Sequence, residues 1–497
     1  MASAALLGAV RVLSFPGVLY VLVGAAVGYI FGFLPGLTAS VALSVLLPLT
    51  YGMEPDFAIM MCAGVLGGVC FGGSISAILL NTPGTGSNAA TTLDGYPMSK
   101  EGRASEALGA SASASFLGHA FGILAVIAVM PLMMRIVLSF GPPEWFALGI
   151  GGLSLVASVS GKSLLNGLVA ACLGLLLSTH GVNPVVGSPR YTFGLMSLWD
   201  GLPLVPVLVG MLALPELVLI FSEHTTISAT GKLSGGGTWK GVRATLRNLP
   251  LVALCGTIGT LIGAIPGVGG NVSTWIAYSQ AKSLSKHPEQ FGKGCIEGVI
   301  APEAANDATE GGALMPLLSL GIPGSPSTAV LLGAFITHGL VPGQKLITQQ
   351  LPTVFALLWA HLLGAFVACT IGLWLAKYAA RITVVPTRLL APLLTIVCLV
   401  GCYATRQRAE DLVIAVVFAV LGYAMRRSNI PRVPVLLGLI LGPLVERSYQ
   451  ISMQLSNGSP AIFFTRPYSV FFMLMIPLSL VLPGFLMARR KGQGTTA

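Results

Sequence analysis

Four Pro-Gly steps interrupt apolar stretches of the 497-residue chain, and side chains with hydroxyl and amide groups gather directly after each step. Proline removes a backbone donor and glycine permits backbone angles that other residues avoid, so a helix should break at each step. A helix that restarts after the break presents unpaired N–H groups and its positive dipole end, which suit an anionic ligand. The candidate substrate-binding residues are therefore Pro35, Gly36, Thr38 and Ser40; Pro83, Gly84, Thr85, Ser87 and Asn88; Pro266, Gly267, Gly270, Asn271 and Ser273; and Pro323, Gly324, Ser325, Ser327 and Thr328.

Backbone carbonyls freed before each break predict a second kind of site. Such carbonyls suit a hard cation such as sodium, which takes oxygen ligands. The polar run at 291–307 adds amide and carboxylate oxygens, although helix capping explains Asn306 and Asp307 equally well. The candidate cation-binding residues are Gly32, Asn81, Gly263, Asn306 and Asp307, with sodium as the expected ion and no other metal or cofactor.

The composition indicates that a lipid bilayer surrounds the chain. Hydrophobic residues make up 54% of it and charged residues only 9%, against about 25% charged residues in a typical globular domain. So few charges cannot coat a soluble chain of this length. The net charge of +10 is spread between apolar stretches, which argues for loops of a membrane protein and against a partner nucleic acid.

The polar residues and glycines of these loops also have purely structural explanations. Serine and threonine cap ordinary helices, and glycine ladders such as Gly24 to Gly36 allow tight helix packing. The set of four loops together favours binding, because irregular backbone at membrane depth survives only inside protein or beside a cavity.

Apolar segments predict an all-α polytopic membrane protein, since about 20 apolar residues cross a bilayer. The segments at 37–51, 268–282 and 432–445 are shorter than a full span. Short segments interrupted by proline and glycine, at matching places in two halves, indicate broken helices at a transport site. The expected helices lie near 17–34, 37–51, 56–80, 106–140, 144–160, 163–180, 204–222, 250–265, 268–282, 311–337, 351–380, 385–402, 410–425, 432–445 and 468–488.

The two halves of the chain carry the same signals in the same order. The run Gly28–Gly36, with glycines four apart and a terminal Pro-Gly, is matched by Gly259–Gly267. The pattern at 72–84, a Gly-Gly pair followed by Pro-Gly, returns at 311–324. Four matches in register indicate an internal duplication, with broken helices and helical hairpins in each copy.

Charges predict the orientation of these halves. The central run carries four basic residues against one acid, and Arg489-Arg490-Lys491 lies near the end, so the positive-inside rule places both in the cytoplasm. The turn at 52–56 is acidic and its counterpart in the second half is basic, as an inverted repeat requires. The expected organisation is a first half at 1–222, a basic cytoplasmic linker at 223–248, a second half at 249–450, and a C-terminal helix and tail at 451–497.

The polar stretch at 94–103 is predicted to be a solvated turn that orders the first hairpin, unless Arg103 attracts a carboxylate.

The sequence lacks motifs typical of enzymes. The chain has no GxxxxGK[ST] phosphate loop, no HExxH motif and no credible nucleophile elbow. We therefore expect a protein that is not an enzyme.

An ordered set of motifs resembles the large membrane subunit of the tripartite tricarboxylate transporters. The resemblance covers roughly residues 17–450 and is weaker beyond about 380. The chain departs from the pattern at Asp307, where a second asparagine is expected, and at Gln344-Lys345, where another proline is usual. The motifs are Gly32-Phe-Leu-Pro-Gly36, Gly72-Gly73-Ser74-Ile75-Ser76-Ala77-Ile78, Asn81-Thr82-Pro83-Gly84, Asp94-Gly95-Tyr96-Pro97-Met98, Phe291-Gly292-Lys293-Gly294, Glu297-Gly298-Val299, Pro302-Glu303-Ala304-Ala305-Asn306 and Leu320-Gly321-Ile322-Pro323-Gly324.

This resemblance implies a secondary transporter of the bacterial inner (cytoplasmic) membrane. It implies two partners, a small four-helix membrane subunit and a periplasmic substrate-binding protein. The implied substrates are citrate and related carboxylates, taken up by symport with a cation, commonly sodium. An elevator-like movement of the hairpin-bearing part is expected by analogy with related tripartite systems.

The sequence also bears on two other classes of membrane protein, the stand-alone transporter and the ion channel. A stand-alone ion-coupled carboxylate or anion transporter stays open, because a binding protein would be a separate polypeptide. An ion channel needs a continuous pore, whereas paired broken helices favour alternating access.

Overall fold

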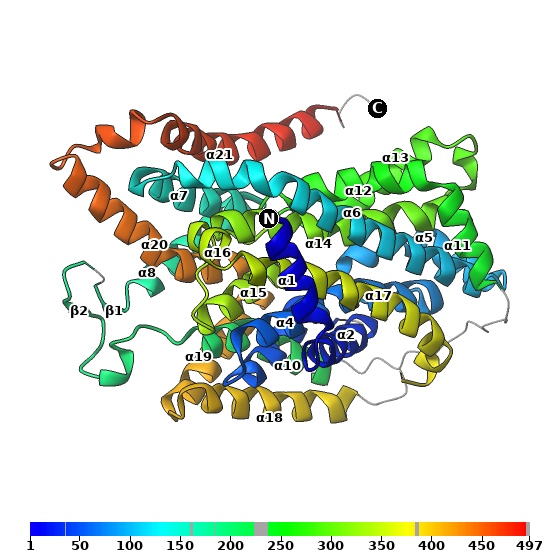
Figure 1. Cartoon of the computed structure of the whole chain (residues 1–497), viewed down its shortest axis with the longest axis horizontal. Helices are drawn as coiled ribbons and strands as arrows, with labels where there is room; N and C mark the ends of the chain where they lie inside the picture. Colours follow the sequence, from blue (N-terminus) through cyan, green and yellow to red (C-terminus); the bar gives the residue numbers. More distant parts are fainter. Residues whose placement is uncertain (35, 160–162, 184, 223–236, 383–386, 494–497) are drawn as a thin grey trace. The chain divides into compact units, whose positions relative to one another are not determined.

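The chain is almost entirely helical, as Figure 1 shows. The two strands that the structure describes are short, β1 (Gly181–Val182) and β2 (Pro189–Arg190), and they pair antiparallel. The predicted all-α class is therefore confirmed. The computed structural model describes residues 1–34, 36–159, 163–183, 185–222, 237–382 and 387–493, without the side chains of 377–382, 387–390 and 481–493.

Two compact units divide the chain, and each takes a stretch from both sequence halves. Unit 1 comprises residues 1–134 and 212–408, and unit 2 comprises residues 135–211 and 409–497. The predicted boundaries at 222, 248 and 450 concern the sequence repeat rather than these units, and they stay predictions.

Unit 1 holds all four Pro-Gly steps. Its helices α1 and α2 meet at a bend of 73°, and α11 and α12 meet at a bend of 78°. The helices are α1 (Ala2–Leu13), α2 (Gly17–Phe33), α3 (Ala39–Leu46), α4 (Pro55–Leu80), α5 (Thr92–Lys100), most of α6 (Ala104–Leu138), α10 (Leu214–Ser222), α11 (Thr238–Arg247), α12 (Leu249–Gly263), α13 (Gly270–Leu284), α14 (Glu297–Leu320), α15 (Pro326–Thr337), α16 (Gln344–Gln349), α17 (Leu351–Ile382) and α18 (Thr387–Arg406), with short turns η1 (Leu47–Thr50), η2 (Gly86–Asn88) and η5 (Pro288–Gln290).

Unit 2 is built on α7, α8 and α20, with α21 packed against α7. A bidentate ion pair joins Arg190 of β2 to Glu446 of α20, with N–O distances of 2.7 and 2.9 Å. Its elements are α7 (Pro142–Val159), α8 (Leu164–Ser178), η3 (Met196–Leu198), α9 (Leu204–Leu208), α19 (Glu410–Arg427), α20 (Val433–Leu455), η6 (Pro460–Phe464) and α21 (Pro467–Gln493), and η4 (Val209–Ala213) joins α9 to α10.

Several helices are long and apolar enough to cross a membrane. Among the described residues these are α4, α6, the stretch Leu204–Ser222 and the Leu351–Ala376 part of α17, and the bent pairs α1–α2 and α11–α12 raise the number from four to six. The prediction of a polytopic membrane protein is confirmed.

The duplicated sequence signals fold into duplicated local structure. Helix α4 ends at Asn81 in the left-handed conformation (φ 54°), and α14 ends at Gly321 in the same way (φ 67°). The expected breaks follow, since α5 begins only at Thr92 and α15 at Pro326. The breaks after α2 and α12 also match, because Gly36 and Gly267 have φ of 86° and 88°. Pro35 lies outside the described residues.

The glycine ladders let helices approach closely, which is the structural role suggested for them by the sequence. A Cβ on Gly28 would overlap the carbonyl of Val65 on α4, and a Cβ on Gly259 would overlap the carbonyl of Ala305 on α14. The pairs α2–α4 and α12–α14 are therefore packed backbone to backbone.

Two predicted helix bounds were wrong, and part of the predicted linker is helical. Helix α14 begins at Glu297 rather than near 311, because the polar side chains in its first turns, among them Glu303, Asn306 and Asp307, turn inward and are buried. Helix α20 runs to Leu455 rather than 445, with Glu446 paired to Arg190. Part of the predicted linker, residues 238–247, forms α11.

Candidate functional site

Loops from the two sequence halves meet in unit 1. Turn η2 of the first half lies against α13 of the second. A Cβ on Gly86 would come 2.9 Å from Asn271 Oδ1, and a Cβ on Gly270 would come 3.1 Å from Ser87 Cβ. Two of the predicted binding loops are therefore neighbours.

A second contact joins the two sequence halves. Helix α3, which follows the first Pro-Gly step, packs against α15, which follows the fourth. The Gly324 carbonyl accepts the Gly267 N–H at 3.0 Å, so the third and fourth steps are also joined. In the η2–α13 and α3–α15 contacts each half thus contributes one element, whereas the Gly267–Gly324 bond lies within the second half.

Hydrogen bonds within the loops engage most of the predicted hydroxyls. Thr85 Oγ1 donates to Asn88 Oδ1 at 2.6 Å, and the hydroxyls of Thr38 and Ser40 lie 2.9 Å apart. Ser325 and Thr328 form a capping box at the start of α15. Helix capping, the structural alternative given for the loop hydroxyls, therefore accounts for this pair. A substrate-binding role for the loop residues stays a prediction.

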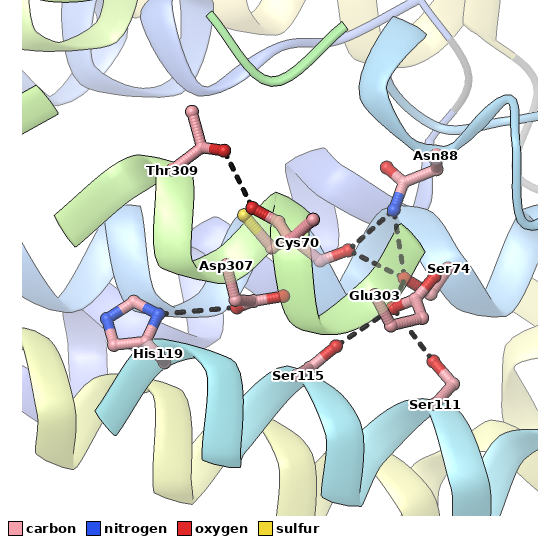
Figure 2. Close-up of polar contacts among 10 residues, drawn as sticks. Cys70, Ser74, Asn88, Ser111, Ser115, His119, Glu303, Asp307 and Thr309 are labelled. Carbon is pink, nitrogen blue, oxygen red and sulfur yellow. Dashed lines mark hydrogen bonds and ion pairs between the residues drawn. The ribbon is translucent and has the colours of Figure 1, made fainter. Parts of the chain in front are cut away.

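The centre of the site is a carboxylate that the sequence prediction did not include, Glu303 of α14. Its side chain is fully buried. Figure 2 shows it between Ser74 of α4 on one side and Ser111 and Ser115 of α6 on the other. These hydroxyls donate to Glu303 Oε2 at 2.6, 3.0 and 2.8 Å, and Thr91 Oγ1 donates to Oε1 at 2.5 Å.

Asn88 ties this centre to the first-half loop. Its amide Nδ2 donates to Ser74 Oγ at 2.9 Å and to the Cys70 carbonyl at 3.2 Å. Of the predicted substrate-binding residues, Asn88 is thus one hydrogen bond away from a hydroxyl that contacts Glu303.

A second buried acid lies one turn along α14. Asp307 Oδ1 pairs with His119 Nδ1 of α6 at 3.3 Å, and the His119 ring meets the His361 ring edge to face at 4.1 Å between centroids. All three side chains are buried. Neither Asn306 nor Asp307 caps a helix, so that alternative is wrong; both lie inside α14.

Further hydroxyl contacts join α14 to the second-half loops. The hydroxyls of Ser273 and Thr309 lie 2.7 Å apart, and Ser327 Oγ donates to Glu310 Oε2 at 3.3 Å. Asn306 Oδ1 is the atom nearest to a Cβ built on Gly270, at 2.9 Å. Predicted substrate residues and predicted cation residues are therefore contiguous in the second half.

The other predicted cation ligands are placed less centrally. Asn81 is exposed at the end of α4. Gly32 and Gly263 pack against Val69 and Thr309, and their carbonyls face Gly84 and Gly324. Across the described ranges, no three His, Cys, Asp or Glu side chains are grouped to hold a metal ion.

Asp94 clamps the first-half hairpin to the second half. It is fully buried in α5, so the predicted solvated turn at 94–103 is wrong. Its Oδ1 accepts backbone N–H groups of Gly292, Gly294 and Cys295 at 2.8 to 2.9 Å, and its Oδ2 accepts the Tyr278 hydroxyl at 2.8 Å. Four hydrogen-bond donors satisfy the Asp94 carboxylate inside the protein, so it does not need contact with water.

Arg103, the alternative carboxylate-binding residue of this stretch, is engaged within the chain. Its guanidinium donates to Glu106 at 3.1 and 3.2 Å and to Glu101 at 3.2 Å. The hydrogen bond to Glu106 is the main reason that the pKa of Arg103 is raised above its ordinary value.

The sequence did carry a signal for Glu303 and Glu310, the two acids that the prediction missed beside Asp307. Glu303, Asp307 and Glu310 are spaced i, i+4 and i+7, which places them on one helix face. Small residues of α6 and α14, among them Ala110 and Ala301, bring these two helices together, and a Cβ on Gly118 would overlap Ala304.

Duplicated broken helices that meet beside buried acids in a polytopic membrane chain are typical of membrane transporters. Residues 18–437 match the model of the Tripartite tricarboxylate transporter TctA family. The chain belongs to this family and is therefore a membrane subunit of a tripartite tricarboxylate transporter, which confirms the resemblance seen in its motifs.

Two relatives come from Agrobacterium vitis. An uncharacterized 52.8 kDa protein in the TAR-I ttuC' 3' region is 34% identical over 451 residues, 90% of this chain and 89% of that protein. An uncharacterized protein in the TAR-II ttuC' 3' region is 36% identical over 209 residues, 42% of this chain and 86% of that protein. No solved structure shows a significant match.

Proposed function

We propose that this chain imports citrate-like tricarboxylates or related carboxylates across the bacterial inner membrane by symport with sodium. The observation that carries the proposal is the crosswise contact of the loops, in which η2 meets α13 and α3 meets α15. Hydroxyls, amides and helix N-termini are the groups that bind carboxylates without burying a permanent positive charge. Here both halves supply them at neighbouring positions.

The proposed transporter works with two partners. A periplasmic substrate-binding protein delivers the carboxylate, and a small four-helix membrane subunit completes the complex. Membership of a tripartite family supports this arrangement. The central linker and the C-terminus lie on the cytoplasmic side in this proposal, as their basic residues predict.

The charge of the substrate explains why a cation is needed. Moving one elementary charge across 100 mV costs about 2.3 kcal/mol, so a trivalent anion entering alone against an inside-negative potential faces about 7 kcal/mol. Net inward movement of positive charge requires at least about four sodium ions with a trivalent anion, or about three with a divalent one.

An elevator-like movement would carry the substrate across. Both loop contacts, Glu303 and Asp307 belong to unit 1. The substrate loops and the buried acids can therefore move as one body, which is what such a movement requires.

The proposal is tested with the chain, its small membrane partner and its binding protein. The binding protein is first screened with a panel of carboxylates by thermal shift. The best ligand is then supplied to proteoliposomes with and without the binding protein. We expect uptake only when the binding protein is present. Equal uptake without it would favour the stand-alone transporter, and no uptake of any carboxylate would contradict the proposed function.

A further inference from the structure

The buried acids of α14 are not balanced by a lysine or an arginine among the described residues. Glu303 and Asp307 are 0% and 1% exposed. In the part of the chain that the structure describes, no lysine or arginine pairs with them, and the ion-pair partner of Asp307 is His119. Burying an ionised carboxylate without an opposite charge is costly, especially in a membrane. A cation from solution can supply the missing charge.

The hydrogen bonds at Glu303 suit its ionised form. Four hydroxyl groups lie within hydrogen-bond distance of it, three at Oε2 and one at Oε1, and each can donate to an ionised carboxylate. Each hydroxyl oxygen keeps lone pairs when it donates. The shell around Glu303 is therefore rich in oxygen atoms that a hard cation takes as ligands.

Unpartnered atoms next to this shell point to a ligand. Asp307 Oδ2 is buried and has no hydrogen-bond partner, and the same holds for His119 Nε2 and for both ring nitrogens of His361. A buried carboxylate oxygen left without a donor is rare in a folded protein. A bound cation would be the partner of this oxygen.

We propose that a dehydrated sodium ion binds between Glu303 and Asp307. The two carboxylates supply the charge, and the hydroxyls of Ser74, Ser111 and Ser115 supply neutral oxygens. This oxygen donor set favours a hard cation over the transition metals that prefer nitrogen and sulfur ligands, and sodium is the hard cation that the proposed function requires. Asp307 was among the cation ligands predicted from the sequence, whereas Glu303 and the three serines were not. The inference rests on the proposed function, because the ion at this site is the coupling ion.

Binding is measured on the purified chain, so that the test does not depend on transport. Melting temperature is followed as sodium chloride replaces choline chloride at constant ionic strength, with potassium chloride as a second series. A ligand of the folded state raises the melting temperature saturably. We expect this response to sodium in the wild type and its loss in Glu303→Gln and Asp307→Asn.

Helix α6 offers a matched set of serines. Ser111 and Ser115 donate to Glu303, whereas Ser113 donates to the carbonyls of Gly109 and Ala110 in its own helix. We expect Ser111→Ala and Ser115→Ala to raise the apparent dissociation constant for sodium about tenfold, the effect of losing one ligand of about 1.4 kcal/mol. Ser113→Ala should leave the constant unchanged.

The outcomes separate this site from the proposed function. Equal responses to sodium, potassium and choline overturn the site, and so does an unchanged sodium constant in Glu303→Gln. If Glu303→Gln does not fold, an unchanged constant in the Ser111→Ala/Ser115→Ala double variant overturns the site instead. Sodium-driven uptake combined with either result leaves the proposed function standing. Sodium binding here without carboxylate uptake supports the site and contradicts the function.

Discussion

The Asp94 carboxylate accepts a 2.8 Å hydrogen bond from the Tyr278 hydroxyl and thereby joins α5 of the first sequence half to α13 of the second. Helix α5 follows turn η2, and α13 begins with the residues that η2 contacts. The bond therefore fixes both sides of one loop contact. Disturbing it should disturb the loops without removing any of their polar groups.

Asp94→Asn should destabilise the chain by about 2 kcal/mol, because its bonds to three backbone N–H groups lose their charge. Tyr278→Phe removes one hydrogen bond and should cost about 1 kcal/mol. Chemical denaturation in detergent measures both. Glu101→Gln changes an exposed acid and is the control; an equal loss of stability in all three variants would refute the clamp.

Gly86→Ala should weaken substrate affinity at little cost in stability. The new Cβ would lie 2.9 Å from Asn271 Oδ1, the end of an exposed side chain that can shift. We expect a higher KM for uptake with an unchanged melting temperature. Gly84→Ala and Gly324→Ala provide the contrast, since their Cβ atoms would overlap backbone and should reduce folding itself. Unchanged KM in Gly86→Ala would argue against this loop contact as the substrate site.

Arg190→Lys should destabilise unit 2, because lysine cannot do what Arg190 does there. The guanidinium binds both oxygens of Glu446, and this hydrogen bonding raises the pKa of Arg190 above its ordinary value. A lysine cannot make the same planar double contact. We expect a loss of about 1 kcal/mol in unfolding free energy. The value is small because the Arg190–Glu446 pair is partly exposed and water screens its attraction. A lysine variant as stable as wild type would show that geometry is unimportant there.

Helix α11 should lie at the cytoplasmic surface. Lys240, Arg243 and Arg247 are exposed on it, next to exposed Trp239, as in an interfacial helix on an anionic leaflet. A cysteine at Lys240, in a background with the exposed Cys172 changed to serine, should react with an impermeant thiol reagent only in inside-out vesicles. Labelling in spheroplasts would place the linker on the other side.

The sequence predicts the helix breaks well, because proline and glycine act locally and their effect does not depend on distant residues. Gly36, Gly267 and the ends of α4 and α14 all follow this rule. Hydropathy fails where polar residues are buried against polar partners. For this reason the start of α14 was placed too late and Asp94 was taken to be solvated.

The role of Glu303 could not be predicted from its own neighbourhood in the chain. Its partners Ser74, Ser111 and Ser115 are separated from it by 188 to 229 positions. The close packing of α6 on α14, which glycine and alanine permit, brings Ser111 and Ser115 to Glu303, and the contact of α4 with α14 brings Ser74. The i, i+4, i+7 spacing of the acids indicates a shared face, but it does not show what that face meets.

The central claim is that carboxylate entry is coupled to sodium. The most direct measurement is uptake of labelled carboxylate by proteoliposomes that hold the complete complex and its binding protein, under an inward gradient of sodium, potassium or protons, each at zero and at inside-negative potential. The account predicts accumulation with sodium alone, faster at negative potential, and its loss in Glu303→Gln. Equal uptake under all three gradients with no response to potential would contradict it.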